Sequence, residues 1–337
     1  MKKIFLILLI FSGLAACHNF DIEHPDFEYT SGYFPYQFPV RTLVLGDYIY
    51  DNTNDNAHKF VISVAMGGVY ENNQDREFEI EVDNSLCDQI LFNANGDTIR
   101  AMPSSYYTLS SSDKIVIPSG EMNGGVIVQL TDAFFNDPLA IKLGYVVPIR
   151  LIGSTDVDTV LSGSSTNPNA DVRVSSQWAV APKNFTMFAV KYINEYHGTY
   201  FHYGASKVKD SGGSELESKT YSEKYVENNP TAKLVTTGRN QVSLTTSLNS
   251  DVMTGEITML LNFSGNKCTI TSAEGAAYTV SGTGEFKSKA YSWGNKERDG
   301  IVLNFTISDG QQTYEASDVL VARDRGVVME VYSPVVY

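Results

Sequence analysis

Several features are scarce in this sequence, and each scarcity argues against certain classes of fold or function. Helical periodicity is nearly absent, which argues against a helical bundle or an α/β fold. No Cys-x-x-Cys pair or cysteine–histidine spacing suggests a zinc site, and we expect neither a metal nor another cofactor. The longest apolar run, residues 4–14, has about 11 residues, whereas a membrane-spanning helix needs roughly 20.

Basic residues are also in the minority. The chain of 337 residues carries 25 Lys and Arg against 39 Asp and Glu, a formal net charge of −14. This balance argues against nucleic acid and against an anionic membrane surface as partners. Charged residues make up only 19%, while 20 Tyr, 17 Phe and 26 Gly favour half-buried strands joined by tight turns.

The first residues follow the order of a bacterial lipoprotein signal. Lys2 and Lys3 precede the apolar run, and Leu14-Ala15-Ala16-Cys17 matches a leucine, two small residues and a cysteine. We therefore expect residues 1–16 to be a signal peptide and Cys17 to be lipidated, because two or three acyl chains make a stable anchor. The alternative is an ordinary secretory signal in which the cysteine is incidental.

Residues 17–39 are predicted to form the lipid anchor and a tether. Asp21, Glu23 and Asp26 form an acidic cluster that resembles the surface-export signal of Bacteroidetes lipoproteins. A solvated acidic tether is the alternative reading. The expected location is the outer membrane, lipid-anchored and facing the cell exterior.

Residues 40–190 are predicted to form an immunoglobulin-like β-sandwich. Turns recur every eight to twelve residues between about seven strand candidates, as in such sandwiches. One short helix is predicted at 84–92, capped by Asn84 or Ser85. The strand candidates are residues 40–46, 58–67, 77–83, 105–110, 113–117, 124–131 and 144–153.

Residues 191–337 are predicted to form an antiparallel β-barrel. Explicit turns such as Ser211-Gly212-Gly213 and Ser308-Asp309-Gly310 favour sequential hairpins between residues 198 and 333. Roughly eight to ten such strands can remove their free edges by closing into a barrel. The expected fold class is therefore all-β, an immunoglobulin-like sandwich followed by a barrel.

Two cysteines remain if Cys17 carries lipid. Cys87 and Cys268 lie in different predicted domains. A disulfide between them would be possible in an oxidising compartment, but two buried free thiols are favoured.

Several stretches resemble a known pair of domains. Residues 103–110 (PSSYYTLS), 117–130 (IPSGEMNGGVIVQL) and 145–154 (YVVPIRLIGS) resemble the adhesin-like N-terminal domain of unknown function in Bacteroidetes surface lipoproteins. Residues 192–204 (YINEYHGTYFHYG) and 317–328 (SDVLVARDRGVV) resemble the lipocalin-like β-domain that follows it. Proteins of this kind are commonly linked to glycan-utilisation systems. The resemblance therefore implies a surface glycan-binding accessory protein, without established binding residues.

Glycan sites combine flat aromatic faces with planar polar side chains. In residues 291–299 a tryptophan adjoins a polar turn, which makes Tyr291, Trp293, Asn295 and Arg298 candidate ligand-binding residues. The alternative is that Trp293 plugs the end of the barrel.

A second aromatic stretch covers residues 196–203. Tyr200 and His202 share one face of the predicted strand, and Phe201 and Tyr203 share the other. One set should fill the core and the other could line a pocket or a domain interface. Tyr200 and His202 are therefore further candidate ligand-binding residues.

No paired-carboxylate, Ser/His/Asp or Cys/His constellation stands in a recognisable motif, so we expect no enzyme. The favoured function is a non-catalytic surface lipoprotein that binds a glycan for a polysaccharide or host-glycan utilisation system. It would deliver that glycan to an outer-membrane transporter or a glycosidase. Two alternatives stay open: an adhesin-like protein–protein interaction module, and a lipocalin-like binder of a small apolar ligand.

Overall fold

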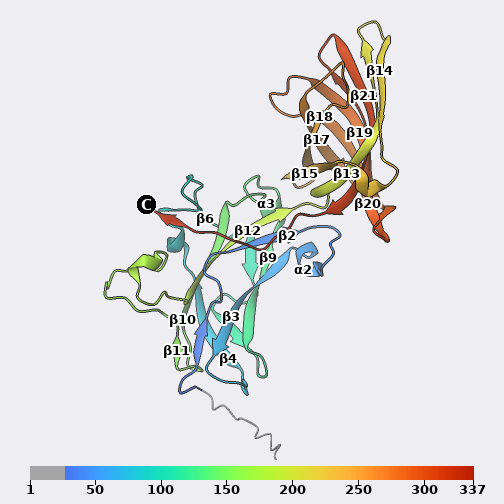
Figure 1. Cartoon of the computed structure of the whole chain (residues 1–337). Helices are drawn as coiled ribbons and strands as arrows, with labels where there is room; N and C mark the ends of the chain where they lie inside the picture. Colours follow the sequence, from blue (N-terminus) through green and yellow to red (C-terminus); the bar gives the residue numbers. More distant parts are fainter. Residues whose placement is uncertain (1–26) are drawn as a thin grey trace, which may run out of the picture.

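The computed structural model describes residues 27–337 as an all-β protein with two parts, a pair of stacked sheets and a barrel (Figure 1). The predicted signal peptide and Cys17 lie outside the described residues. Within residues 27–337, no helix has the length and apolar character needed to cross a membrane.

Two sheets form the first domain. The first sheet has the order β11(Thr159–Val160), β1(Ser31–Tyr33), β3(Lys59–Gly67), β9(Asn123–Leu130), β7(Tyr107–Leu109). The second has the order β22(Glu330–Val331), β2(Pro39–Val44), β12(Phe185–Ile193), β10(Tyr145–Gly153), β4(Arg76–Val82), β8(Lys114–Ile117), with β6(Arg100–Ala101) beside β10.

The core of this domain lies between the two sheets. On β3, the buried side chains Phe60, Ile62 and Val64 alternate with more exposed neighbours, as a half-buried strand requires. Phe78 and Ile80 of β4 contribute to the same core from the second sheet. The structure therefore confirms the β-sandwich that the sequence predicted for this domain.

Short elements connect the strands. They are α2(Thr53–Asn56), η1(Asn84–Cys87), β5(Ile90–Leu91), α3(Asp132–Phe135), η2(Ser175–Gln177) and η3(Val226–Asn228). The helix predicted at 84–92 is wrong, because only the single turn η1 forms. Asp83 accepts a hydrogen bond from Ser85 N at 3.0 Å, but Gln89 has φ of 51°, which a right-handed helix does not allow.

The second domain is a closed barrel. Eight strands follow one another around it, and β13 pairs with β21 to close the ring. β14(Glu215–Tyr221) is an additional strand that pairs with the second half of β13. The barrel strands are β13(Gly198–Asp210), β15(Thr231–Gly238), β16(Gln241–Ser247), β17(Glu256–Ser264), β18(Lys267–Ser272), β19(Thr279–Trp293), β20(Lys296–Ser308) and β21(Gln312–Asp324).

Side chains of the chain itself fill the barrel interior. Apolar residues from all eight strands form one buried cluster. A polar group is buried among them: Asp318 lies 2.7 Å from His202 Nε2 and also accepts a hydrogen bond from Tyr221 Oη. Burial beside this carboxylate raises the pKa of Tyr221. A filled interior argues against a small apolar ligand inside the barrel.

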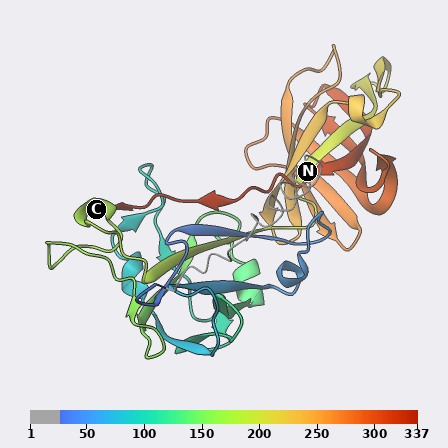
Figure 2. The same cartoon turned by 60° about the horizontal axis from the view of Figure 1, so that its bottom comes forward.

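The last residues leave the barrel, although the sequence predicted a barrel over the whole of residues 191–337. Gly326, with φ of 63°, turns the chain after β21. β22 then pairs with β2, and β23(Val335–Val336) pairs with β5, both in the first domain. Tyr332 is buried there and donates to Met187 O at 2.7 Å. Figure 2 shows this segment running back along the first domain.

One segment of the predicted tether also belongs to the first domain. Residues 31–33, within the range predicted as tether, form β1 and pair with β3. The prediction about the cysteines is confirmed, since Cys87 and Cys268 are both buried free thiols. Burial raises the pKa of Cys87 to about 12 and that of Cys268 to about 11.

Arg325 joins the two domains. It follows β21 and donates hydrogen bonds to three backbone carbonyls, those of Asp47 (2.9 Å), Leu45 (3.0 Å) and Asn194 (2.6 Å). Two of these belong to the loop after β2, and the third to the corner where β12 leads into β13. Burial lowers the pKa of the guanidinium, and the three carbonyls compensate for its lost hydration.

The corner at residues 194–198 is fixed by its own hydrogen bonds. Asn194 Nδ2 donates to the carbonyls of Gly238 (3.0 Å) and Gln241 (2.9 Å). His197 Nδ1 accepts from Thr236 N at 3.1 Å, which requires an unprotonated nitrogen. Burial, followed by the charge of Arg325, lowers the pKa of His197 to about 4.

A second arginine bridges the domains on another side. Arg239, in the turn between β15 and β16, lies 2.7 Å from Asp132 of α3, and its guanidinium lies 5.9 Å from the ring of Phe135. The barrel is therefore held against the first domain at two separate places.

Removing the carboxylate inside the barrel should destabilise it. Asp318→Ala removes the carboxylate that His202 and Tyr221 both contact, and we expect the free energy of unfolding to fall by about 2–4 kcal/mol. Urea denaturation followed by circular dichroism measures the change. Asp251→Ala, whose side chain is 86% exposed, serves as the control. Equal effects of the two substitutions would contradict the structural role of Asp318.

Removing the Arg325 side chain should loosen the domain junction. Arg325→Ala leaves three carbonyls without their donor, and we expect a loss of about 2–4 kcal/mol together with faster proteolysis near residues 45–50. The neighbouring exposed Arg323, whose Nε is 3.5 Å from Asp324, provides the control. Arg323→Ala should cost less than about 1 kcal/mol. If Arg325→Ala is cleaved no faster than the unmodified chain, Arg325 does not hold the domain junction together.

Mild acid should weaken the same junction through His197. Its pKa lies near 4 in the folded chain, below the ordinary value of 6.5, so the unfolded chain takes up a proton first as pH falls. Stability is then lost between about pH 6.5 and 4, by up to about 3 kcal/mol. Melting temperatures across this range, compared with His197→Gln, isolate the contribution. A wild-type curve parallel to that of the variant would disprove it.

Candidate functional site

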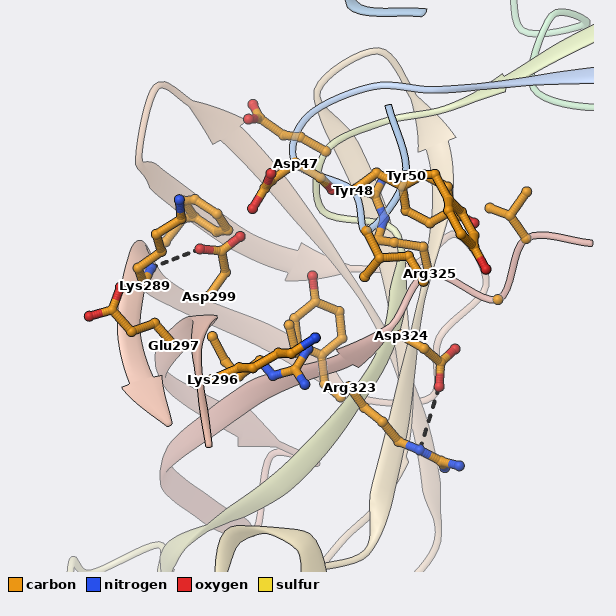
Figure 3. Close-up of a pocket in the computed structure, with 18 of the residues that line it drawn as sticks. Asp47, Tyr48, Tyr50, Lys289, Lys296, Glu297, Asp299, Arg323, Asp324 and Arg325 are labelled. Atoms are coloured by element: carbon orange, nitrogen blue, oxygen red, sulfur yellow. Dashed lines mark hydrogen bonds and ion pairs between the residues drawn. The ribbon is translucent and has the colours of Figure 1, made fainter. Parts of the chain in front are cut away.

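A cleft of about 500 Å³ lies where the two domains meet. Three segments form its walls: the loop at residues 47–50 of the first domain, the hairpin at the tip of β19 and β20, and the segment after β21 at residues 322–328. Figure 3 shows their side chains facing one another across the opening. Neither domain forms this cleft alone.

Aromatic side chains come from both domains. Tyr48 and Tyr50 stand on the first-domain loop with ring centroids 5.5 Å apart, and Tyr50 is 68% exposed. Tyr200 and Phe286 come from the barrel. Tyr200 is buried at the cleft, and its hydroxyl donates to Tyr196 O at 2.8 Å. Burial raises the pKa of its hydroxyl, so Tyr200 stays neutral and forms part of the buried floor of the cleft.

Charged residues of both signs surround these rings. The cationic ones are Lys289, Lys296, Arg298, Arg323 and Arg325, and the acidic ones are Asp47, Glu195, Glu297, Asp299 and Asp324. Arg323 and Asp324 contact each other, and Arg325 is occupied by the carbonyls of the junction. The side chains on the β19–β20 hairpin are the more available ones.

The shape of the β19–β20 hairpin follows from its local sequence. Gly294 and Asn295 occupy its tight turn with φ of 58° and 57°. A bulge follows Lys287, and Lys289 has φ of 51°. There the carboxylate of Asp299 accepts from Lys289 N at 2.8 Å. The bulge bends the hairpin over the outer face of the barrel, toward the cleft.

Trp293 supports the site without lining it. Its indole Nε1 donates to Ala322 O at 2.9 Å, and its ring meets that of Phe201 edge-on at 5.2 Å. The guanidinium of Arg298 lies 4.1 Å from the centroid of the Trp293 ring. Trp293 thus anchors the hairpin to the outside of the barrel and carries Arg298 on its free face.

The structure brings two of the six predicted ligand-binding residues together in the cleft, Arg298 and Tyr200. Tyr291 packs against Gly300, and Asn295 occupies the tight turn between β19 and β20. His202 shares a strand face with Tyr200, as predicted, but that face places it inside the barrel against Asp318. These positions leave the binding roles of the six residues as predictions.

Sequence reasoning missed the contribution of the first domain. Tyr48, Ile49 and Tyr50 follow Gly46, whose φ of 85° turns the chain after β2. Three large apolar or aromatic side chains in a row shortly after a turn glycine, of which Ile49 and Tyr50 are exposed, are a signal that could have marked this loop. Their position opposite the barrel depends on tertiary packing, which the local pattern does not contain.

Other depressions have a different chemistry. One of about 500 Å³ lies on the outer barrel face and is lined by polar side chains such as Asn262, Thr269 and Asn304. Another of about 310 Å³ lies in the first domain near Tyr36 and Phe38. The cleft at the junction differs from both because residues of two domains form it and because it combines several aromatic rings with five cationic side chains, all of which follow the first domain in the chain.

Comparison with known proteins gives the family. A model described as a domain of unknown function, DUF5627, matches residues 195–326, and a model described as an N-terminal domain matches residues 27–158. No curated protein matches the chain. These two ranges correspond to the barrel and to most of the first domain.

Three solved structures from Bacteroides ovatus are similar. A protein of unknown function is 34% identical with a TM-score of 0.86, over 92% of this chain and 100% of that one. A multidomain protein including DUF1735 is 12% identical, with a TM-score of 0.42 over 87% and 94% of the chains. A third, provisionally described as a carbohydrate binding protein, is 12% identical, with a TM-score of 0.30 over 89% and 97%.

The last two likenesses are too low to support an argument about this chain. The first covers the whole of its counterpart at an identity that shows common descent. The chain therefore belongs to the family of this Bacteroides ovatus protein of unknown function, in which a DUF5627 barrel follows an N-terminal β-domain.

Proposed function

We propose that this protein is a non-catalytic, lipid-anchored protein of the outer bacterial surface that binds a glycan in the cleft between its two domains. The observation that carries the proposal is the make-up of the cleft, in which exposed aromatic rings from the first domain face polar and charged side chains of the barrel. The lipoprotein-like sequence around Cys17 supports the surface location.

Sugars suit this arrangement for a physical reason. The C–H face of a pyranose ring packs on an aromatic ring, which contributes buried area and dispersion. Hydroxyl groups need hydrogen-bonding partners around that contact, and charged or amide side chains at the rim supply them. Tyr50 supplies the exposed ring, and Lys296 and Arg298 supply donors within the same cleft.

The proposed role in a glycan-utilisation system is delivery. A protein without a catalytic constellation would hold the glycan near the membrane until a transporter or a glycosidase takes it. Because the walls of the cleft come from two domains, the arrangement of the domains would decide whether the site is complete.

A protein partner is the second candidate. Ile49 is 73% exposed, and Val328 and Met329 beside the cleft are 68% and 75% exposed. Exposed apolar side chains gathered at one place are typical of protein contact surfaces. Such a surface would fit a transporter or an enzyme of the same system.

A glycan array tests the proposal directly. The chain from residue 18 onward, which contains every described residue, is compared with Tyr50→Ala and Trp293→Ala. We expect glycan binding to fall at least about tenfold in both variants, equivalent to about 1.4 kcal/mol. Tyr50→Ala removes an aromatic face, and Trp293→Ala releases the hairpin that carries Arg298.

Tyr225→Ala is the matched control, because Tyr225 is also exposed, at 53%, but does not line the cleft. It should bind like the unmodified chain. Binding that survives in both cleft variants would move the site elsewhere. If no glycan binds, glycan recognition fails as a function, and capture of outer-membrane proteins that depends on Ile49 and Met329 would favour the second candidate.

A further inference from the structure

We propose that the cleft takes an acidic glycan, whose carboxylate or sulfate group is held by Arg298, Lys296 and Lys289. This inference rests on the proposed glycan binding and adds the chemical class of the ligand. Its basis is that the described residues offer none of these three head groups an anionic partner, although all three line the cleft.

Among the described residues, no acidic side chain of the cleft forms an ion pair with these three cations, and two of the acidic side chains have other partners. Asp299 accepts hydrogen bonds from Ser288 Oγ at 3.1 Å and from a backbone N–H at 2.8 Å. Asp324 faces Arg323. Figure 3 shows Asp47 on the first-domain side of the opening.

Glu297 is adjacent to Lys296 and Arg298 in sequence but belongs to the other face of the hairpin. Lys296 pairs with Trp293, whereas Glu297 pairs with Ser292. Because successive residues of a strand point to opposite faces, Lys296 and Arg298 share the Trp293 face and Glu297 does not. Figure 3 shows Glu297 directed away from the centre of the cleft.

Arg298 is the best organised of the three. Its guanidinium carbon lies 4.1 Å from the centroid of the Trp293 ring, and Trp293 is itself fixed by its hydrogen bond to Ala322 O. The Nε of Arg298 is buried and has no hydrogen-bond acceptor among the described residues. A guanidinium oriented on an aromatic face, without its own carboxylate, is suited to bind an external one through its terminal nitrogens.

The charge of the whole molecule makes this local arrangement selective. With a formal net charge of −14, the chain repels polyanions in general. An acidic glycan would therefore bind only where cationic groups are concentrated, with its sugar ring on the aromatic wall and its anionic group on the hairpin. Such binding should weaken as salt screens the attraction.

An array of matched oligosaccharides tests the inference. It carries uronic acid, sialic acid and sulfated glycans, each beside its carboxyl-reduced or desulfated form. The chain from residue 18 onward is compared with Arg298→Gln, Lys296→Gln and Tyr50→Ala. Lys287→Gln is the control, because Lys287 lies on β19 of the same β19–β20 hairpin, contacts Glu285 at 3.5 Å and does not line the cleft.

We expect the unmodified chain to prefer acidic forms and Arg298→Gln to lose roughly ten- to a hundredfold in affinity for them. Lys287→Gln should bind normally, and Arg298→Lys should recover part of the loss. The carboxyl-reduced and desulfated arms identify which anion is held. Circular dichroism of each variant guards against misfolding.

Two results would overturn the inference, and they differ. If glycans bind in a Tyr50-dependent way but equally in acidic and neutral forms, the ligand class is wrong while glycan binding stands. If no glycan of either kind binds, the proposed function fails and the inference fails with it.

Discussion

The arrangement of this molecule depends on one buried guanidinium. Arg325 satisfies carbonyls at the end of β2, in the following loop and at the corner that begins the barrel. The carbonyls of Leu45 and Asn194 directly follow β2 and β12, and that of Asp47 lies in the loop, outside the strand ladders that supply donors elsewhere. Together with the contact of Arg239 with Asp132, Arg325 therefore holds the Asp47–Tyr50 loop, the barrel and the segment after β21 against one another. The cleft exists because these three segments meet there.

The outer surface of the barrel contributes side chains to the cleft, whereas its interior stabilises the fold. Tightly packed side chains and the buried group of His202, Asp318 and Tyr221 occupy the inside. Three cationic side chains of the cleft that have no ion-pair partner among the described residues come instead from the β19–β20 hairpin, which carries a bulge. A closed barrel supplies a rigid support for such a hairpin, since it has few edges through which it can deform.

Much of the fold follows from local patterns in the sequence. Alternation in β3 and β4 and the glycine turns of the second domain predict the strands closely, because period and turn chemistry are local properties. The faces of Tyr200 and Phe201 also follow from that period. The prediction of a helix at 84–92 was wrong because Gln89 adopts a positive φ, which its residue type does not indicate.

The site was harder to predict than the strands for a physical reason. Arg298 and Tyr200 lie in stretches that looked suitable, but their partner Tyr50 comes from a loop some 150 residues away from Tyr200 in the chain. The pairing of β22 with β2 joins residues that are still further apart in the chain, such as Val40 and Glu330, and involves only two residues on each strand. Periodicity does not record such contacts, since they depend on which strand edges remain open after each domain has folded.

The return of β22 to the first domain has a mechanical consequence. The chain enters the barrel from β12 and leaves it toward β22, and these two strands lie on either side of β2 in one sheet. In the chain, the barrel is thus an insertion in the first domain, to which two polypeptide connections join it instead of one. A single connection would allow the barrel to rotate about it, whereas two connections restrict the barrel to bending about the line between the two connections. Tension applied to the barrel would be shared between both connections and would load β2 in shear, the direction in which the hydrogen bonds between neighbouring strands must break together.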